Sequence, residues 1–368
     1  MDYEWKAKRE KAAFLALADG AVFRGYAAGF PEDRVGEAVF NTGMTGYQEI
    51  LTDPSYAGQF VALTAAEIGN YGCRDADAES RACFLNGLVV HELNPPSNHR
   101  AETGLREYLV ANRVPAIAGV DVRALTLHLR EHGSMKAWLH VAPGPLAVEE
   151  AIEKARAWEG LDGQDYARKV TTAAPYRWNE SGKWHVVAYD FGVKRNILRR
   201  LAARDLQVTV VPAATPAAEV LAARPDGVFL SNGPADPAAL PYAADNVRAL
   251  LGQVPLMGIC LGHQLLGLAC GAKCGRLKYG HHGCNHPVKN LVTNAVEITS
   301  QNHNYALRDL PDCLELTHVN LNDGTVEGFR HKTLPALAVQ YHPEAAPGPH
   351  DADALFDQFA AMLSQRHS

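Results

Sequence analysis

The chain has 368 residues, of which 47% are hydrophobic and 21% are charged, a composition typical of a soluble globular protein with two domains. Its net charge of −6 and pI near 6.2 give no reason to expect nucleic acid as a partner. No apolar run approaches the roughly 18 residues that a membrane-spanning helix needs, so no membrane protein is expected.

The N-terminus combines basic residues with the apolar stretch 12–18, which resembles a short secretory signal peptide. Against that interpretation, the leader also holds Asp2, Glu4 and Glu10, and the apolar stretch is at the minimum of about seven residues. We therefore predict a first β-strand here and a cytoplasmic protein. The seven cysteines suit a reducing compartment, because an odd number scattered over a long chain is a poor disulfide framework.

The first half of the chain predicts a mixed α and β domain, with extended segments early and helices after them. The expected strands cover residues 13–17, 22–26, 38–41 and 60–65, and the expected helices cover 103–112 and 122–131. Residues 159–183 carry glycine, proline and polar residues with little periodicity, which is typical of a linker. We therefore predict an N-terminal domain over residues 1–158, a linker over 159–183 and a second domain over 184–368.

From Trp184 onward, continuous apolar segments alternate with amphipathic ones. This pattern is typical of an α/β fold in which helices cover both faces of a mostly parallel sheet. The expected strands cover residues 185–190, 208–211, 227–230 and 254–257, and the expected helices cover 193–204, 217–223, 243–251 and 354–362.

A loop rich in glycine and proline follows the expected strand 227–230. It reads Ser231-Asn232-Gly233-Pro234-Ala235-Asp236-Pro237. In a parallel sheet, the loops at the carboxyl ends of the strands gather at one edge, where ligands bind. Taken alone, this loop is only a connection between a strand and a helix.

The most informative motif is Gly258-Ile259-Cys260-Leu261-Gly262-His263-Gln264, which lies between an apolar run and a helix-like stretch at 265–270. A strand, a G-x-C-x-G corner and a helix make a nucleophile elbow, with cysteine in place of serine. The two glycines permit a turn sharp enough to push Cys260 out of the sheet. The following helix directs unpaired N–H groups at the sulfur and favours the thiolate. Cys260 is therefore the predicted nucleophile.

The chain beyond the elbow contains a group of six cysteines and histidines, which are residue types that bind zinc. They are Cys270, Cys274, His281, His282, Cys284 and His286. However, the group holds no tight C-x-x-C pair, and Cys270 and Cys274 flank the expected helix end at Gly271. We expect no bound metal, and elemental analysis for zinc would test the alternative.

A histidine and a glutamate two residues apart follow the expected strand 337–340, in the sequence Tyr341-His342-Pro343-Glu344. Pro343 biases His342 toward an extended conformation, and residues two apart in an extended chain project to the same side. Glu344 can therefore orient the imidazole while the other ring nitrogen faces a thiol. This tripeptide alone is weak evidence, but with the elbow it predicts a Cys260–His342–Glu344 triad for acyl transfer. Backbone N–H groups of Gly233 and Leu261 would hold the oxyanion.

The order of these motifs resembles the class I, triad-type glutamine amidotransferases, which release ammonia from glutamine through a cysteine thioester. The motifs are Ser-Asn-Gly-Pro, Gly-x-Cys-x-Gly-His-Gln, Gln-Asn-His and His-Pro-Glu. The long segment 40–56 in the first half resembles the small subunit of carbamoyl-phosphate synthase, as do residues 280–283, 285–288 and 343–351. The similarity covers essentially the whole chain.

Carried over position by position, this resemblance makes Cys260 the nucleophile, His342 the base and Glu344 its orienter. The residues that would hold L-glutamine are Gly43, Gly233, Ala235, Leu261, Gln264, Asn302, Asn304 and Tyr305. The chain departs from the family pattern at several of these: Gly43 stands where a serine is often found, Ala235 replaces a glycine, and Asn304-Tyr305 replaces a Gly-Phe pair. Asparagine tolerates the left-handed geometry that a glycine at position 304 would supply.

The resemblance also implies a partner, because free ammonia is soon protonated near neutral pH and then no longer a nucleophile. The chain shows no G-x-x-x-x-G-K-[ST] loop, so no cofactor is expected in it. The implied partner is a large subunit that uses ATP, its metal ion and bicarbonate for arginine and pyrimidine synthesis. Together they would form a heterodimer or a higher oligomer, docked through the N-terminal domain.

Two alternatives stay open at this point. The first is another class I amidotransferase subunit, such as one serving chorismate-derived aminations, against which the dedicated N-terminal half argues. The second is a catalytically silent binding subunit, which the departures at Ala235 and Asn304 keep open.

Overall fold

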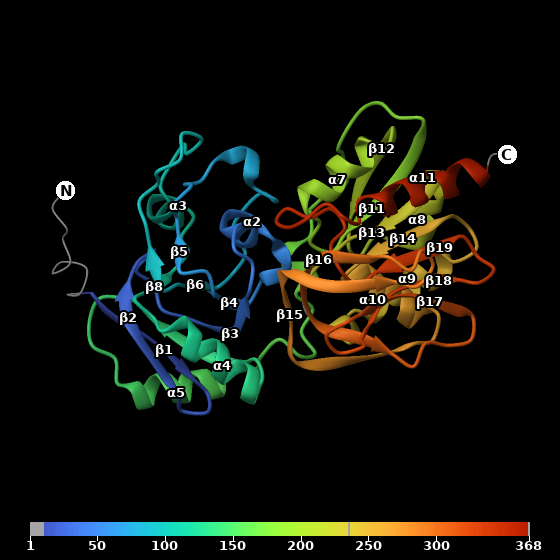
Figure 1. Cartoon of the computed structure of the whole chain (residues 1–368). Coiled ribbons are helices and arrows are strands. Elements are labelled where there is room, and N and C mark those ends of the chain that lie inside the picture. Colours follow the sequence, from blue (N-terminus) through green and yellow to red (C-terminus); the bar gives the residue numbers. More distant parts are fainter. Residues whose placement is uncertain (1–10, 235, 367–368) are drawn as a thin grey trace. The chain divides into compact units, whose positions relative to one another are not determined.

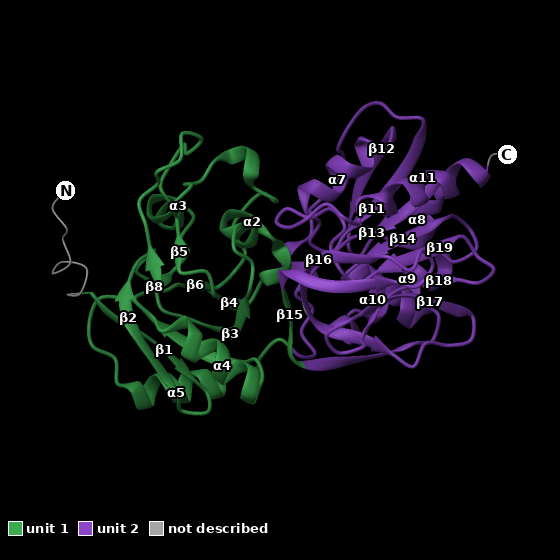
Figure 2. Cartoon of the chain, viewed as in Figure 1, with its two compact units in different colours: residues 1–161, 278–282 green, residues 162–277, 283–368 purple. Residues whose placement is uncertain are grey.

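The computed structural model describes residues 11–234 and 236–366. The chain divides into two compact units (Figure 2), with residues 1–161 and 278–282 in unit 1 and residues 162–277 and 283–368 in unit 2. In the part of the chain that the structure describes, no helix has the length and apolar character needed to cross a membrane.

Unit 1 is built on a closed β-barrel with the strand order β1-β2-β8-β6-β4-β3-β9 (Figure 1). The apolar residues of its strands fill its interior, where Leu15, Phe60 and Leu139 are fully buried. The strands of unit 1 are β1 (Ala12–Leu17), β2 (Val22–Ala27), β3 (Arg34–Asn41), β4 (Gln59–Leu63), β5 (Glu67–Ile68), β6 (Gly87–Val89), β7 (Glu92–Leu93), β8 (Ala116–Ala118) and β9 (Met135–His140). The mixed α and β domain predicted for this half is confirmed.

Helices and short 3-10 helices lie between these strands and after the last of them. They are α2 (Tyr47–Thr52), η1 (Pro54–Tyr56), η2 (Asp75–Asp77), α3 (Leu105–Ala111), α4 (Val122–His132) and α5 (Val148–Ala157). The segment 40–56 occupies the end of β3, the turn after it, and α2 with η1. Its side chains Tyr47 and Tyr56 are almost fully buried in unit 1.

Unit 2 contains, within the described residues, a ten-stranded sheet with the order β10-β12-β11-β13-β14-β19-β18-β17-β15-β16. The strands β12, β11, β13, β14 and β19 pair in parallel, as predicted. Their bounds are β11 (Trp184–Asp190), β12 (Leu206–Pro212), β13 (Gly227–Leu230), β14 (Leu256–Ile259) and β19 (Ala336–Val339). The remaining strands are β10 (Tyr176–Arg177), β15 (Lys273–Asn290), β16 (Val296–Arg308), β17 (Leu314–Asn320) and β18 (Val326–His331).

Helices cover both faces of this sheet. On one face, the core includes side chains of α8 (Ala217–Ala222), α9 (Pro241–Leu250) and α10 (Leu261–Ala269). On the other, α7 (Arg195–Ala202) and α11 (Ala354–Arg366) pack against the alternate residues of the same strands. The carboxyl ends of the parallel strands are thereby left for the loops that carry the predicted site.

The segment 159–183, predicted as a linker, contains two short elements of secondary structure. It includes α6 (Ala167–Val170) and β10, which pairs antiparallel with β12. The Thr172 N–H donates to Asp190 Oδ2 at 2.7 Å, and Thr171 Oγ1 accepts from the Ala213 N–H at 2.9 Å. The polar composition that suggested a linker instead supplies hydrogen bonds to the ends of the sheet, so residues from 162 onward belong to unit 2.

Candidate active site

Cys260 occupies a sharp corner between β14 and α10. Its φ of 54° and ψ of −106° lie in a region that non-glycine residues rarely adopt. The corner closes because its neighbours lack side chains: a Cβ on Gly262 would lie 2.1 Å from the Leu230 carbonyl oxygen, and one on Gly258 would lie 2.6 Å from the Gly262 oxygen. α10 starts directly after Cys260, four residues earlier than predicted, so the helix N-terminus lies at the cysteine.

His342 lies with its imidazole between Glu344 and the elbow. An isolated bridge to Ser300 of β16 fixes its backbone, with the His342 N–H donating to the Ser300 oxygen at 2.9 Å. Its Nδ1 lies 2.7 Å from Glu344 Oε1. Its Nε2 is buried and has no hydrogen-bond partner among the described residues, while the Cys260 thiol donates to the Asn302 carbonyl oxygen at 3.5 Å. In the described part of the chain, no other side chain occupies this nitrogen, and the Cys260 sulfur is close enough to raise the pKa of His342.

A buried lysine, which the sequence analysis did not single out, completes this arrangement. Lys194 Nζ donates to Glu344 Oε1 at 2.9 Å and to the Ala345 oxygen at 2.6 Å. Lys194 is 2% exposed and Glu344 is 0% exposed. Lys194 is the last residue of the loop between β11 and α7, and that position could have suggested it, because such loops gather at the ligand edge of a parallel sheet.

The charges of these groups shift each other's protonation. Burial alone would raise the pKa of Glu344, but the Lys194 ammonium and the His342 imidazole hold that pKa well below its usual range. Burial alone would lower the pKa of His342, but the Glu344 carboxylate and the Cys260 sulfur raise it above its usual value. Glu344 is therefore ionised and suited to stabilise an imidazolium.

Gly233 and Leu261, the two predicted oxyanion residues, lie side by side. A Cβ on Gly233 would lie 2.9 Å from a methyl carbon of Leu261 and 2.2 Å from the Phe191 oxygen. The Ser231 oxygen accepts the Gly262 N–H at 3.0 Å, which ties this loop to the first turn of α10. The two loops expected to share the oxyanion are thus held together.

Three further predicted glutamine-binding residues contact one another or the nucleophile. Gln264 Nε2 donates to the Tyr305 oxygen at 2.9 Å and to Gln340 Oε1 at 3.0 Å, and Asn302 accepts from the Cys260 thiol. Asn304 lies between Asn302 and Tyr305 in β16 and is 8% exposed. Its φ is not positive, so this position does not require the left-handed conformation that glycine favours.

Two predicted glutamine-binding residues remain, Gly43 and Ala235. Gly43 belongs to unit 1, where its N–H donates to Asn41 Oδ1 at 2.7 Å. Ala235 lies outside the described residues.

The six residues weighed as zinc ligands are divided between the two units. His281 and His282 belong to unit 1, and the other four belong to unit 2. In unit 2, the Cys313 thiol approaches the Cys270 oxygen at 3.9 Å, and Cys284 Sγ lies 3.7 Å from Ser300 Oγ.

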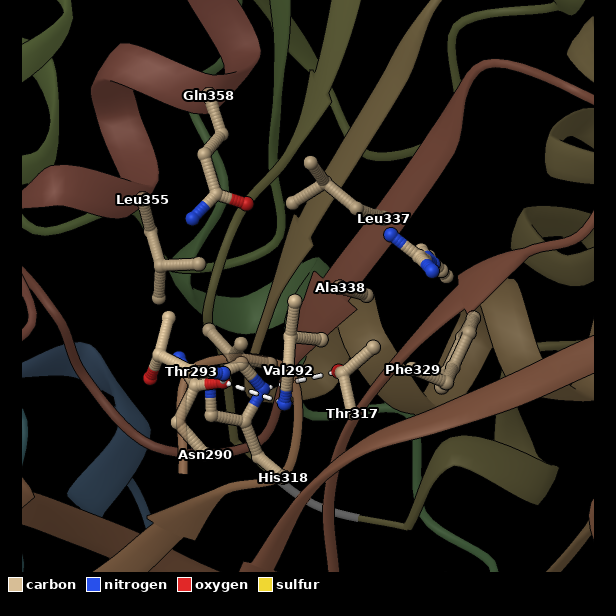
Figure 3. A pocket seen from close by; sticks show the side chains of 12 residues that line it. Asn290, Val292, Thr293, Thr317, His318, Phe329, Leu337, Ala338, Leu355 and Gln358 are labelled. Carbon is tan, nitrogen blue, oxygen red and sulfur yellow. Dashed lines mark hydrogen bonds between the residues drawn. The ribbon is translucent and has the colours of Figure 1, made fainter. Parts of the chain in front are cut away.

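A separate cavity of about 90 Å³ lies between β17, β18, β19 and α11 (Figure 3). His318 borders it, with Nδ1 2.9 Å from Thr317 Oγ1 and Nε2 buried without a partner among the described residues. Burial lowers the pKa of His318 to about 4, so the ring is neutral near neutral pH. Val339 also borders the cavity, and its carbonyl oxygen accepts the Cys260 N–H at 2.9 Å. The cavity therefore borders β19, the strand whose Val339 carbonyl oxygen holds the backbone of Cys260.

Sequence comparisons match both halves of the chain to one family. The profile described as "Carbamoyl-phosphate synthase small chain, CPSase domain" matches residues 15–139, and that of "Glutamine amidotransferase class-I" matches residues 187–362. Carbamoyl phosphate synthase small chain from Syntrophotalea carbinolica is 50% identical, over 96% of this chain and 98% of the relative. The protein of that name from Pseudomonas aeruginosa is 51% identical, over 97% and 99%.

The chain belongs to the carbamoyl-phosphate synthase small-chain family. This membership confirms the family resemblance and the amidotransferase-like fold of unit 2. The amidotransferase match includes the elbow and the segment at His342, so in this small chain the cluster described above lies within the amidotransferase domain.

Proposed function

We propose that this small chain is the glutaminase subunit of carbamoyl-phosphate synthase. It hydrolyses L-glutamine and passes the ammonia to a large synthetase subunit, which makes carbamoyl phosphate from bicarbonate and ATP. The observation that carries the proposal is the buried pair of His342 and Glu344, whose Nδ1 and Oε1 lie 2.7 Å apart, in the domain that carries the Cys260 elbow. We infer that the reaction takes place in the cytoplasm and, by family, supplies arginine and pyrimidine synthesis.

The first half of the reaction forms a thioester. Cys260 Sγ attacks the carboxamide carbon of glutamine, and its proton passes to His342 Nε2. Backbone N–H groups of Leu261 and Gly233 donate to the oxyanion. When the C–N bond breaks, His342 returns the proton to the leaving nitrogen, which departs as ammonia.

The second half of the reaction releases glutamate. Water attacks the thioester carbon, His342 takes the proton of that water, and the C–S bond breaks to free Cys260. Glu344 orients the imidazole in both halves and stabilises its protonated form. Lys194 acts on His342 only through Glu344, because its ammonium keeps Glu344 ionised.

The partner is the large subunit, because ammonia is useful only where an acceptor site takes it before protonation. ATP and its metal ion belong to that subunit, and this chain needs no cofactor for the chemistry above. We assign the docking of the large subunit to unit 1 and the smallest assembly to a heterodimer. Co-purification from the native host, with identification of the co-purifying protein, tests whether the large subunit is the partner; a chain that purifies alone would contradict it.

The glutaminase assignment is tested by Cys260→Ser. This variant is expected to bind glutamine and barely hydrolyse it, and near-normal turnover would exclude Cys260 as the nucleophile. A diazoketone analogue of glutamine is expected to label the wild type at Cys260. Cys270→Ser is the matched control, because its thiol lies at the far end of α10 and its loss leaves labelling unchanged. Absence of labelling at Cys260 would instead indicate a silent binding subunit.

A further inference from the structure

Tyr305, a predicted glutamine-binding residue, is held at both of its ends within unit 2. Its carbonyl oxygen accepts from Gln264 Nε2 at 2.9 Å and lies 2.7 Å from His303 Nδ1. Its hydroxyl donates to Asp162 Oδ1 and accepts from Arg276 Nη1 at 3.3 Å. The Arg276 guanidinium also lies 5.6 Å from the centre of the Tyr305 ring and forms an ion pair with Asp162. Both the backbone and the side chain of Tyr305 are therefore fixed.

Gly163, the residue after Asp162, contacts the loop that follows β13 and carries Gly233. The Gly163 N–H donates to Asp236 Oδ2 at 3.2 Å, and Asp236 Oδ1 accepts from the Ala238 N–H at 2.9 Å. Asp236 lies three residues after Gly233 in the loop that follows β13. Two adjacent residues thus hold two separate segments, of which one carries Tyr305 and the other carries Gly233.

The chemistry of the Tyr305 contact favours a defined geometry. Burial and the hydrogen bond to Asp162 raise the pKa of Tyr305 well above its usual value, so the hydroxyl keeps its proton and remains a donor. A hydrogen bond to an ionised acceptor is stronger than one between neutral groups. The contact depends on the tyrosine hydroxyl, and phenylalanine, which the family resemblance gives at this position, cannot make it.

We propose that Asp162 is a positioning residue for glutamine binding, which acts through Tyr305, and that Gly163 supports the neighbouring loop through Asp236. The inference rests on the proposed function, because it assumes that the backbone at Tyr305 contacts the substrate. None of the contacts of Asp162 and Gly163 described here involves Cys260, His342 or Glu344. Loss of the Asp162 contact therefore weakens glutamine binding and leaves the chemical steps intact.

The experiment is a double-mutant cycle in the full-length chain. Glutamine binding is measured by calorimetry with Cys260→Ser as the parent, and KM and kcat are measured with Cys260 present in the complex with the partner. Asp162→Ala and Tyr305→Phe are each expected to raise the Kd and KM for glutamine about threefold to tenfold, a modest effect because the Asp162 side chain is 63% exposed. The double variant is expected to match either single variant, because each removes the same contact.

Asp165→Ala is the matched control. Asp165 lies three residues from Asp162 and pairs with Arg168 at 3.0 Å, so its loss is expected to leave glutamine binding unchanged. Thermal unfolding of every variant verifies that the fold is retained, and Tyr305→Phe keeps the test available if Asp162→Ala does not fold.

The outcomes separate the positioning role of Asp162 from the proposed glutaminase function. If the parent binds glutamine and Asp162→Ala binds it equally well, or lowers kcat at unchanged KM, Asp162 has no positioning role and the proposed function stands. If additive losses appear in the double variant, the two residues act independently and the inference is wrong. If the parent binds no glutamine, the proposed function itself fails and this inference fails with it.

Discussion

Replacing Lys194 by methionine tests the buried charge cluster, because it removes one cation and little volume. Lys194 and Glu344 are 2% and 0% exposed. Without the ammonium, Glu344 keeps only the hydrogen bond to His342 among its described side-chain contacts, since its Oε2 has no partner. Removing one member of a buried ion pair typically costs about 3–5 kcal/mol. We expect a loss of that size in the free energy of unfolding.

The assay is urea unfolding near neutral pH. Lys273→Met is the matched control, because Lys273 forms an exposed ion pair with Asp309 and its loss is expected to leave stability unchanged. The double variant Lys194→Met/Glu344→Gln is expected to lose less free energy of unfolding than the sum of the losses of the two single variants, because no unpaired charge remains. A Lys194→Met protein within about 0.5 kcal/mol of the wild type would refute the reasoning, and would mean that Glu344 is already neutral in the fold.

Three further predictions concern the elbow, the triad and the cavity. Gly262→Ala is expected to lower the unfolding temperature and abolish glutaminase activity, because its Cβ would lie 2.1 Å from the Leu230 oxygen; wild-type activity would contradict this. Glu344→Gln is expected to reduce kcat less than Cys260→Ala does, because an orienter acts indirectly; equal losses in steady-state assays would be contrary evidence. The pKa of His318 falls from 6.5 to about 4 on folding, so the unfolded chain protonates first and stability declines by up to about 3 kcal/mol as the pH drops through that range. In urea titrations at several pH values, the stability of His318→Leu should decline less steeply with falling pH than that of the wild type. An unchanged slope would exclude His318 as the source of this pH dependence.

The local parts of the site could be predicted from the sequence because the rules that govern them are local. The G-x-C-x-G spacing implies the corner at Cys260 whatever the rest of the chain does. The restriction that Pro343 places on His342 brings Glu344 beside the imidazole. The 3.6-residue and continuous apolar patterns likewise gave the parallel strands and the helices of unit 2, with bounds that differ by a few residues.

The long-range contacts could not be predicted in this way. Lys194 and Glu344 are 150 residues apart in the sequence, and Asp162 and Tyr305 are 143 apart. No periodicity connects such pairs, and only the folded sheet brings them together. The composition of residues 159–183 does not indicate their hydrogen-bond partners for the same reason, because those partners lie at the carboxyl ends of β11 and β12. The closure of the barrel in unit 1 also depends on strand pairings that no single segment records.

The short stretch 278–282 lies far along the sequence from the rest of unit 1 and yet completes it. The Thr42 N–H donates to the His282 oxygen at 3.2 Å, and the Ser134 N–H donates to the Lys278 oxygen at 3.0 Å. The chain therefore passes from one unit to the other at three points, after residues 161, 277 and 282. A fragment that ends at residue 161 would leave both amides without these acceptors, so no single cut yields two intact halves. Any attempt to graft this amidotransferase onto another synthetase would have to carry both units as one piece.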